Sequence, residues 1–167
     1  MRCDKPGTRG HRGRAEGMDQ GMPETNGGIQ RFRPAIYGVL VQGGDVLLVR
    51  APQSSDGVIG FPGGGIELGE APLDALRREF SEETGLEVEP LRLLWATTGF
   101  HRSRKFPHLQ VLGVYWEVRR IGGALRTEGN EDDVDEAFFC PLGALPEAQM
   151  LSVDREVVQL LGKILAP

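Results

Sequence analysis

The sequence predicts an α/β domain in which helices cover a mixed β-sheet. Runs rich in β-branched and aromatic residues come before, between and after two segments with helical periodicity. Each helical segment has one apolar face, which needs a second layer to pack against. The longest β-rich run, residues 109–118, is apolar on both of its faces, as expected for a strand in a sheet that is covered on two sides.

The first 31 residues differ in composition from the rest of the chain. They hold seven glycines, and Ile29 is their only β-branched aliphatic residue. Such a segment buries too little apolar surface to offset the entropy lost on ordering. We therefore predict a disordered tail rich in glycine and arginine over residues 1–31, and one domain over residues 32–167. The chain length of 167 residues suits a single domain with its own core.

The domain is expected to begin with a β-hairpin. Residues 35–41 and 45–50 are β-rich runs, and the glycines at 43 and 44 between them can adopt positive φ angles. A polar loop over residues 51–57 and a short apolar run over 58–61 should follow. A glycine triplet at 63–65 then leads toward the first helix; taken alone, such a triplet is typical of a loop.

The first helix is predicted over residues 72–84. Pro72 suits the first turn of a helix, and Gly85 suits the position that follows the last turn. Leu73, Leu76 and Phe80 recur at helical spacing and should face the core.

The second half of the domain should supply the rest of the sheet and a second helix. Strands are expected over residues 91–98, 109–118 and 137–140, with Pro90 at the start of the first of them. Ser152 is predicted to cap a C-terminal helix. The apolar face of that helix comprises Val157, Val158, Leu160, Leu161, Ile164 and Leu165.

Three acidic residues of the first helix share one side of it. Glu79, Glu82 and Glu83 stand at i, i+3 and i+4, so their side chains lie within an arc of roughly 100°. Like charges at this spacing destabilise a helix by a few tenths of a kcal/mol per pair. A divalent cation would relieve the repulsion, and hard oxygen ligands suit Mg²⁺ or Mn²⁺.

The same stretch fits a family signature. Each fixed position of the pattern G-x5-E-x7-R-E-U-x-E-E-x-G-U, where U is a bulky aliphatic or aromatic residue, is filled within residues 64–86. These positions are Gly64, Glu70, Arg78, Glu79, Phe80, Glu82, Glu83, Gly85 and Leu86. At average residue frequencies an accidental match has a chance of about one in a million. The chain thus resembles the Nudix hydrolases, the family of MutT, over residues 33–167. That resemblance implies an α/β/α sandwich built on a mixed sheet.

The resemblance also implies a reaction. Nudix hydrolases cleave the pyrophosphate bond of a nucleoside diphosphate linked to another moiety, so we expect a Mg²⁺-dependent enzyme, with Mn²⁺ as a substitute. A nucleoside triphosphate, ordinary or oxidised, is the favoured substrate. ADP-ribose, another nucleotide sugar or a dinucleoside polyphosphate is the alternative. A non-catalytic module that binds a nucleotide as a regulator is an alternative of another class, although degenerate binders commonly lose acids that this chain keeps.

By resemblance, the signature residues take specific roles. Glu79, Glu82 and Glu83 are expected to bind the metal, with the carbonyl of Gly64 as a fourth ligand. Glu79 or Glu82 could instead be the general base, and the sequence leaves that choice open. Arg78 should orient the carboxylates, so that Glu79, Glu82 and Arg78 form the expected catalytic set.

Local geometry gives a different expectation for Arg78. Adjacent residues point about 100° apart on a helix, so Arg78 is not expected to contact Glu79 directly. Glu70 should either pair with Arg78 or favour the positive end of the helix dipole.

A basic segment over residues 101–108 lies between two predicted strands. Its cations suit the outer phosphates of a nucleotide, and Phe106 or Phe100 could stack on the base. The simpler interpretation is an exposed loop that balances nearby acids. The candidate substrate-binding residues are Arg102, Arg104, Lys105 and Phe106.

An acidic segment over residues 128–136 precedes the last predicted strand. In Nudix hydrolases, a further acid from this part of the chain often assists the signature residues. Such a run is otherwise a solvated loop. The candidates are Glu131, Asp133 and Glu136.

Composition narrows the functional classes further. The net charge of −5 argues against general nucleic-acid binding, which depends on clustered basic residues. No apolar run approaches 18 residues, so we expect no membrane span. Two cysteines cannot form the disulfide framework of a small secreted protein, which favours the cytoplasm. We expect a small nucleotide as the partner; a monomer and a homodimer are both compatible with the sequence.

Overall fold

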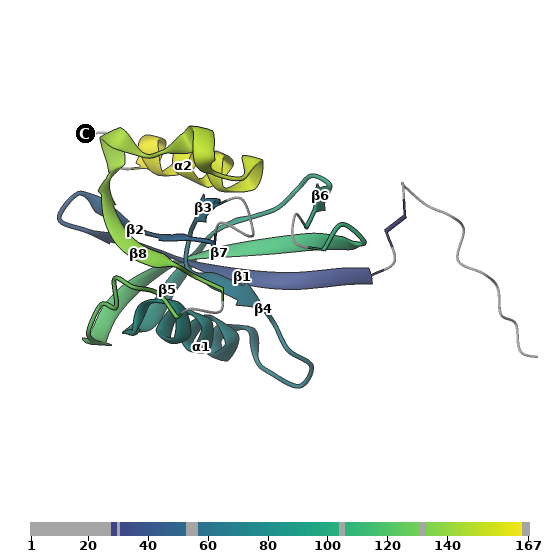
Figure 1. Cartoon of the computed structure of the whole chain (residues 1–167), viewed down its shortest axis with the longest axis horizontal. Coiled ribbons are helices and arrows are strands. Elements are labelled where there is room, and N and C mark those ends of the chain that lie inside the picture. Colours follow the sequence, from purple (N-terminus) through teal and green to yellow (C-terminus); the bar gives the residue numbers. More distant parts are fainter. Residues whose placement is uncertain (1–27, 30, 53–56, 104–105, 131–132, 165–167) are drawn as a thin grey trace, which may run out of the picture.

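The computed structural model describes residues 28–29, 31–52, 57–103, 106–130 and 133–164 (Figure 1). The predicted tail over residues 1–31 falls almost entirely outside these ranges. Along the described chain the elements are β1 (Arg31–Gln42), β2 (Asp45–Arg50), β3 (Ile59–Gly60), β4 (Gly63–Gly65), α1 (Pro72–Thr84), β5 (Leu86–Ala96), β6 (His101–Arg102), β7 (Leu109–Gly123), β8 (Glu136–Pro141), the short 3₁₀ helices η2 (Leu142–Ala144) and η3 (Glu147–Gln149), and α2 (Ser152–Ile164).

The sheet is mixed, as predicted. Its main order is β3-β2-β1-β7-β5, while β4 pairs with β1, β6 with β7 and β8 with β2. The parallel pair is β1 with β7, in register from Arg31↔Leu109 to Leu40↔Val118. All other strand pairs are antiparallel. Figure 1 shows α1 on one face of the sheet and α2 on the other, which confirms the predicted fold class.

Each helix closes a separate core. Leu76 and Phe80 of α1 are fully buried against the sheet, and Phe80 comes so close to β1 that a Cβ on Gly38 would lie 2.7 Å from its ring. On the opposite face, Val157 and Leu161 of α2 pack into the second core. Alternate side chains of β1 and β7 therefore pack into the two cores on opposite faces of the sheet.

The first hairpin and the first helix form where the sequence predicts them. Gly43 and Gly44 have φ angles of 64° and 91°, the positive pair that a two-residue type I′ turn requires. Helix α1 covers residues 72–84. Gly85 ends it in the left-handed conformation, with its N–H donating to the Ser81 carbonyl at 2.8 Å.

Several boundaries differ from the sequence-based expectation. Strand β5 begins at Leu86 and passes through Pro90, because it lies at the sheet edge and its register shifts between Pro90 and Arg92. Strand β7 continues to Gly123, and the glycine triplet forms strand β4. Ser152 is the first residue of α2 and so lies inside the helix that it was expected to cap.

The apolar face predicted for the C-terminal helix is largely buried. Val157, Val158 and Leu161 are buried and Leu160 is half-buried, while the side chain of Ile164 and the whole of Leu165 lie outside the described part.

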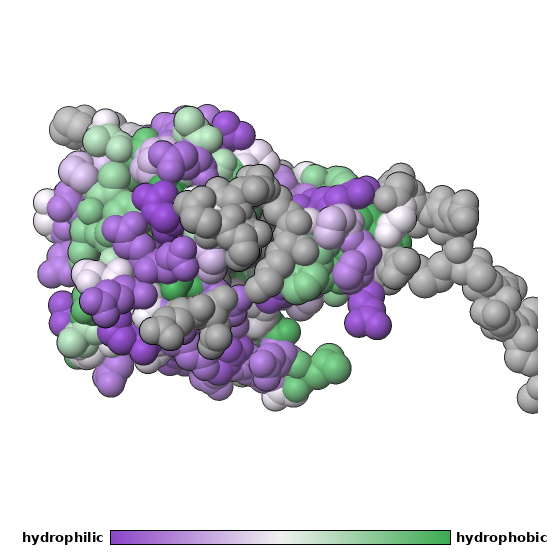
Figure 2. Space-filling model, viewed as in Figure 1, coloured by the Kyte–Doolittle hydropathy of each residue, from purple (hydrophilic) through white to green (hydrophobic). Residues whose placement is uncertain are grey.

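Figure 2 shows that hydrophilic residues cover most of the α1 surface in the view that it draws. Within the described residues, no helix has the length and apolarity needed to span a membrane.

Candidate active site

The acidic side of α1 faces the glycine strand β4. The N–H of Gly63 donates to Oε2 of Glu83 at 2.8 Å. A Cβ on Gly64 would lie 2.5–2.7 Å from the carboxylate atoms of Glu79, so only glycine lets that carboxylate lie against the strand. Gly63 itself has a φ of 143° and its Cα lies so close to β1 that a Cβ would collide with the Ile36 carbonyl. Because Gly63 and Gly64 have no Cβ, the β4 backbone and the carboxylates of Glu79 and Glu83 can lie in contact.

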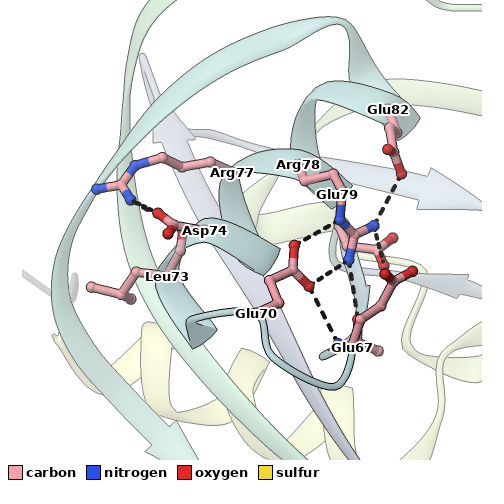
Figure 3. A network of polar contacts seen from close by, with 9 residues as sticks. Glu67, Glu70, Leu73, Asp74, Arg77, Arg78, Glu79 and Glu82 are labelled. Carbon is pink, nitrogen blue, oxygen red and sulfur yellow. Dashed lines mark hydrogen bonds and ion pairs between the residues drawn. The ribbon is translucent and has the colours of Figure 1, made fainter.

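Arg78 connects the glutamates of this region (Figure 3). Its Nε and Nη2 donate to the two oxygens of Glu70 at 2.8 and 2.9 Å. Its Nη1 donates to Oε1 of Glu79 at 2.9 Å and to Oε2 of Glu82 at 3.2 Å. The helical-wheel expectation that Arg78 does not contact Glu79 is therefore wrong. The long arginine side chain turns back because Glu70, which precedes the helix, binds two of its nitrogens.

Burial changes the acidity of the glutamates. Glu83 is 7% exposed, and burial raises its pKa to about 8, although the Gly63 N–H bond acts against the shift. Burial also raises the pKa of Glu79, opposed by its hydrogen bond to Arg78. Glu70 behaves in the opposite way, since the hydrogen bond from Arg78 lowers its pKa. A cation would therefore favour the ionised forms of the two helix carboxylates that the protein itself disfavours.

The donor chemistry of the site suits a hard divalent cation. Glu79, Glu82, Glu83 and the Gly64 carbonyl supply only oxygen ligands, the kind that Mg²⁺ and Mn²⁺ prefer. As placed, however, the described His, Cys, Asp and Glu side chains include no group of three that could hold a metal ion. The reason is visible in the contacts: Arg78 binds Glu79 and Glu82, whereas Glu83 turns to Gly63. Metal binding would require these carboxylates to exchange partners.

A cavity of about 810 Å³ lies on the α2 side of the sheet. Alternate residues of β1 (Arg33, Ala35 and Tyr37) and of β7 (Val111, Gly113 and Tyr115) form its floor. The beginning of α2 supplies a wall. Among the residues that the structure describes, Arg33, Arg102 and Arg155 line the cavity against one acid, Asp133, so this part of its charged lining is predominantly positive. Positive charge beside aromatic and apolar surface suits an anionic ligand that carries a ring system.

The cavity adjoins the acidic site. Arg33 lines it and lies against Gly65, so that a Cβ on Gly65 would be 2.7 Å from the guanidinium nitrogens Nε and Nη2. Asp133 lines it as well, and its charge contributes to the raised pKa of Glu83. Arg33 therefore connects the cavity with β4, and Asp133 connects it electrostatically with Glu83.

The residues predicted outside the signature have separate locations. Arg102, Asp133 and also Phe100 line the cavity, whereas Phe106 does not. Glu136 instead pairs with Arg50 at 3.1 Å. Arg104, Lys105 and Glu131 lie outside the described residues.

Sequence reasoning missed Arg33, Tyr37 and Arg155. Arg33, Ala35 and Tyr37 stand at i, i+2 and i+4, so strand periodicity puts them on one face of the sheet. That signal could have placed Arg33 and Tyr37 together, but not beside a cavity.

A buried hydrogen bond fixes the wall that α2 contributes. The Tyr115 hydroxyl donates to Oδ1 of Asp154 at 2.8 Å, joining β7 to the first turn of α2. Burial raises the pKa of Asp154 to about 7, with the Tyr115 bond acting against the shift. Tyr37 stacks on Tyr115 with ring centroids 4.9 Å apart.

Comparison with known proteins agrees with this geometry. The family model described as the NUDIX domain matches residues 31–161. The chain belongs to the Nudix hydrolase family. It is 30% identical over 131 residues to the NAD-capped RNA hydrolase NudC of Pseudomonas aeruginosa, a match that covers 78% of this chain and 44% of that protein. This Nudix chain therefore spans less than half of the length of that relative.

Solved structures share the Nudix fold at lower identity. A MutT NUDIX hydrolase from Burkholderia pseudomallei superposes with a TM-score of 0.67 at 21% identity, covering 79% of this chain and 99% of that one. An ADP-ribose pyrophosphatase from Streptococcus suis gives a TM-score of 0.58 at 22% identity, covering 78% and 87%. At these identities the likeness establishes the α/β/α fold of this Nudix protein.

Proposed function

We propose that this Nudix protein hydrolyses the pyrophosphate bond of a nucleoside diphosphate linked to another moiety, with a divalent cation as cofactor. The observation that carries the proposal is the meeting of the Glu79 and Glu83 carboxylates of α1 with the glycine strand β4, beside a cavity with positively charged side chains. A pyrophosphate substrate needs both parts, because its reacting phosphates need a metal site and its nucleoside needs a pocket.

The residues of α1 and β4 would hold the cation. Glu79, Glu82 and Glu83 are the proposed ligands, with the Gly64 carbonyl as a fourth. When bound, a divalent cation neutralises phosphate charge and makes water a stronger nucleophile. Before a cation binds, Arg78 holds the Glu79 and Glu82 carboxylates, and Glu70 holds Arg78 in place.

A base near the attacked phosphorus must accept a proton from water. Glu79 is half-buried at the edge of β4, and Glu82 is more exposed. Either could take the proton, and the other would then serve only as a ligand. The ionised Glu70–Arg78 pair takes no part in this proton transfer, since each partner stabilises the charged form of the other.

The candidate substrates fall into a few chemical classes. A nucleoside triphosphate, ordinary or oxidised, is the substrate that the sequence favours. Of the proteins compared above, one is named an NAD-capped RNA hydrolase and another an ADP-ribose pyrophosphatase, which keeps both of these compounds as alternatives. A panel of nucleoside triphosphates, ADP-ribose, NAD⁺ and NAD-capped RNA, each with Mg²⁺ and with Mn²⁺, would decide among them.

The test of the reaction is the Glu79→Gln variant on the best substrate of that panel. We expect a loss of about 10²-fold or more in kcat, the scale of a positioned acid, base or metal ligand. Chelation of the metal by EDTA should abolish turnover in the wild type. Glu89→Gln is the control, because Glu89 is a half-buried residue of β5 that pairs with Arg119 and not with the acidic site. Turnover near the wild-type rate in Glu79→Gln would refute the proposed site.

A binding module would give another result. If no compound of the panel is hydrolysed but nucleotides bind at micromolar concentration, the protein is a regulator and not a catalyst. The intact set of acids argues against that outcome.

A further inference from the structure

Arg33 occupies the boundary between the acidic site and the cavity. It lies on β1, whose residues Ala35, Ile36 and Tyr37 pair with the three glycines of β4. A Cβ on Gly65 would lie 2.7 Å from Nε and Nη2 of Arg33 and 3.1 Å from its Cζ. Glycine at position 65 thus leaves room for the guanidinium to lie against the β4 backbone. The same side chain lines the cavity.

Arg33 and Arg78 differ in their ion pairs and hydrogen bonds. Arg78 is paired with Glu70, Glu79 and Glu82. The side chain of Arg33, in contrast, makes no hydrogen bond or ion pair within the part of the chain that the structure describes. Its positive charge nevertheless interacts with the acidic site, because it acts to lower the pKa of Glu79. A half-buried guanidinium without a partner keeps all its donors for a ligand.

Phosphate is the ligand chemistry that this arrangement fits. A guanidinium offers parallel N–H donors that match two oxygens of one phosphate. A phosphate bridging the metal site and Arg33 has a cation on each side.

We propose that Arg33 binds the phosphate that remains attached to the nucleoside, and so fixes the direction of the substrate across Gly65. This inference rests on the proposed function. The nucleoside then lies in the cavity between the sheet and the start of α2, and the bond that is cleaved lies at the edge of β4 beside Glu79. Arg33 is a specificity-determining residue, since a substrate bound in the reverse direction would lose this contact.

Binding measurements test the assignment without turnover. Isothermal titration calorimetry with inorganic pyrophosphate, ADP and adenosine, all with Mg²⁺, would compare the wild type with Arg33→Gln and Arg33→Lys. We expect Arg33→Gln to weaken pyrophosphate and ADP binding by about tenfold or more, as for a lost hydrogen-bonded charge, and to leave adenosine unchanged. Arg33→Lys should keep part of the affinity because a single ammonium replaces the two-pronged contact.

Two further variants separate this role from a general loss of charge or of folding. Gly65→Ala leaves Arg33 in the chain but puts a methyl group against its guanidinium, so its binding defect should resemble that of Arg33→Gln. Arg92→Gln is the matched control, because Arg92 is exposed and pairs with Glu117 on β7. Thermal melts would check that every variant folds. In hydrolysis, KM should rise more than kcat falls.

The outcomes are distinct for the two proposals. Equal pyrophosphate and ADP affinity in the wild type and Arg33→Gln would overturn the role of Arg33, whether or not the protein is an enzyme. Failure of the wild type to bind either phosphate compound would overturn it as well. Selective loss of phosphate binding in Arg33→Gln, together with no hydrolysis across the panel, would support Arg33 while refuting the proposed catalysis.

Discussion

The carboxylate of Glu70 and the guanidinium of Arg78 form a two-pronged ion pair, with Nε–Oε1 and Nη2–Oε2 distances of 2.8 and 2.9 Å. Nη1 of Arg78 is left for Glu79 and Glu82 on the following turn. The pair therefore joins the loop before α1 to the acidic side of the helix. It holds the arginine that contacts Glu79 and Glu82.

We predict that Glu70→Gln lowers catalysis without unfolding the domain. A glutamine amide can accept one hydrogen bond from Arg78, but its NH₂ group opposes the second. Loss of a group that orients metal ligands typically costs 10–100-fold in metal affinity or activity, and we expect about that range. Steady-state kinetics and Mn²⁺ titration would measure it. Asp74→Asn, which breaks the Arg77 pair elsewhere on α1, should change neither quantity.

Glu83→Gln should separate stability from metal binding. Because burial raises the pKa of Glu83 to about 8, a neutral side chain already suits its surroundings at pH 7. The glutamine carbonyl can accept the Gly63 N–H in place of Oε2. We expect a melting temperature within about 2 °C of the wild type, since a surrogate of similar shape keeps the packing. Mn²⁺ affinity should fall by about tenfold or more.

A large drop in melting temperature for Glu83→Gln would mean that the ionised carboxylate stabilises the fold. Unchanged Mn²⁺ affinity would remove Glu83 from the proposed ligand set. Glu89→Gln on β5 controls for the loss of one negative charge.

Gly64→Ala should reduce activity solely through a steric clash with the Glu79 carboxylate. The φ angle of Gly64 is not in the left-handed region, so alanine is not strained there by its backbone. The added Cβ would meet the Glu79 carboxylate at 2.5–2.7 Å and push it away from β4. We expect a loss of about tenfold or more in kcat, the cost of a small misplacement at a catalytic site. Wild-type kcat would show that Glu79 acts from another position.

Gly162→Ala provides the matching change away from the site. A Cβ on Gly162 meets nothing within 4 Å, and the residue lies in α2. Alanine is favoured over glycine in a helix by up to about 1 kcal/mol, so this variant should be slightly stabilised and fully active.

Local sequence patterns predict the parts of this molecule that local interactions determine. Helix 72–84, its end at Gly85 and the type I′ turn at 43–44 follow from periodicity and glycine chemistry. Strand β4 does not, because three glycines have no β signal and pair only where β1 offers a partner.

The candidate site also has a part that local sequence predicts and a part that it does not. Spacing brings Glu79, Glu82 and Glu83 to one side of α1, since one helical turn takes about 3.6 residues and positions i, i+3 and i+4 lie close together. The contact of Arg33 with Gly65 and the hydrogen bond from Tyr115 to Asp154 join residues that are 32 and 39 positions apart. Such contacts depend on the strand register, which short motifs do not encode.

Asp154 should make the stability of the domain depend on pH. Its ordinary pKa of 3.8 applies to the unfolded chain, and burial raises the folded value to about 7. Between these values the folded state binds more protons than the unfolded state. The free energy of unfolding therefore falls as pH rises from about 4 to 7, by up to about 1.4 kcal/mol per pH unit from this group. Above about pH 7 the contribution is constant.

Asp154→Asn removes that titration and keeps an acceptor for the Tyr115 hydroxyl, as the protonated acid does. Urea unfolding of both proteins from pH 5 to 8 would give the difference between their free energies of unfolding. We expect the variant to gain stability relative to the wild type as pH rises to about 7, with no further gain beyond it. Comparing the two proteins cancels the titration of other groups, including Glu83. A difference that stays flat from pH 5 to 7 would mean that the buried carboxylate is ionised throughout, held by Tyr115 and the positive end of the α2 dipole.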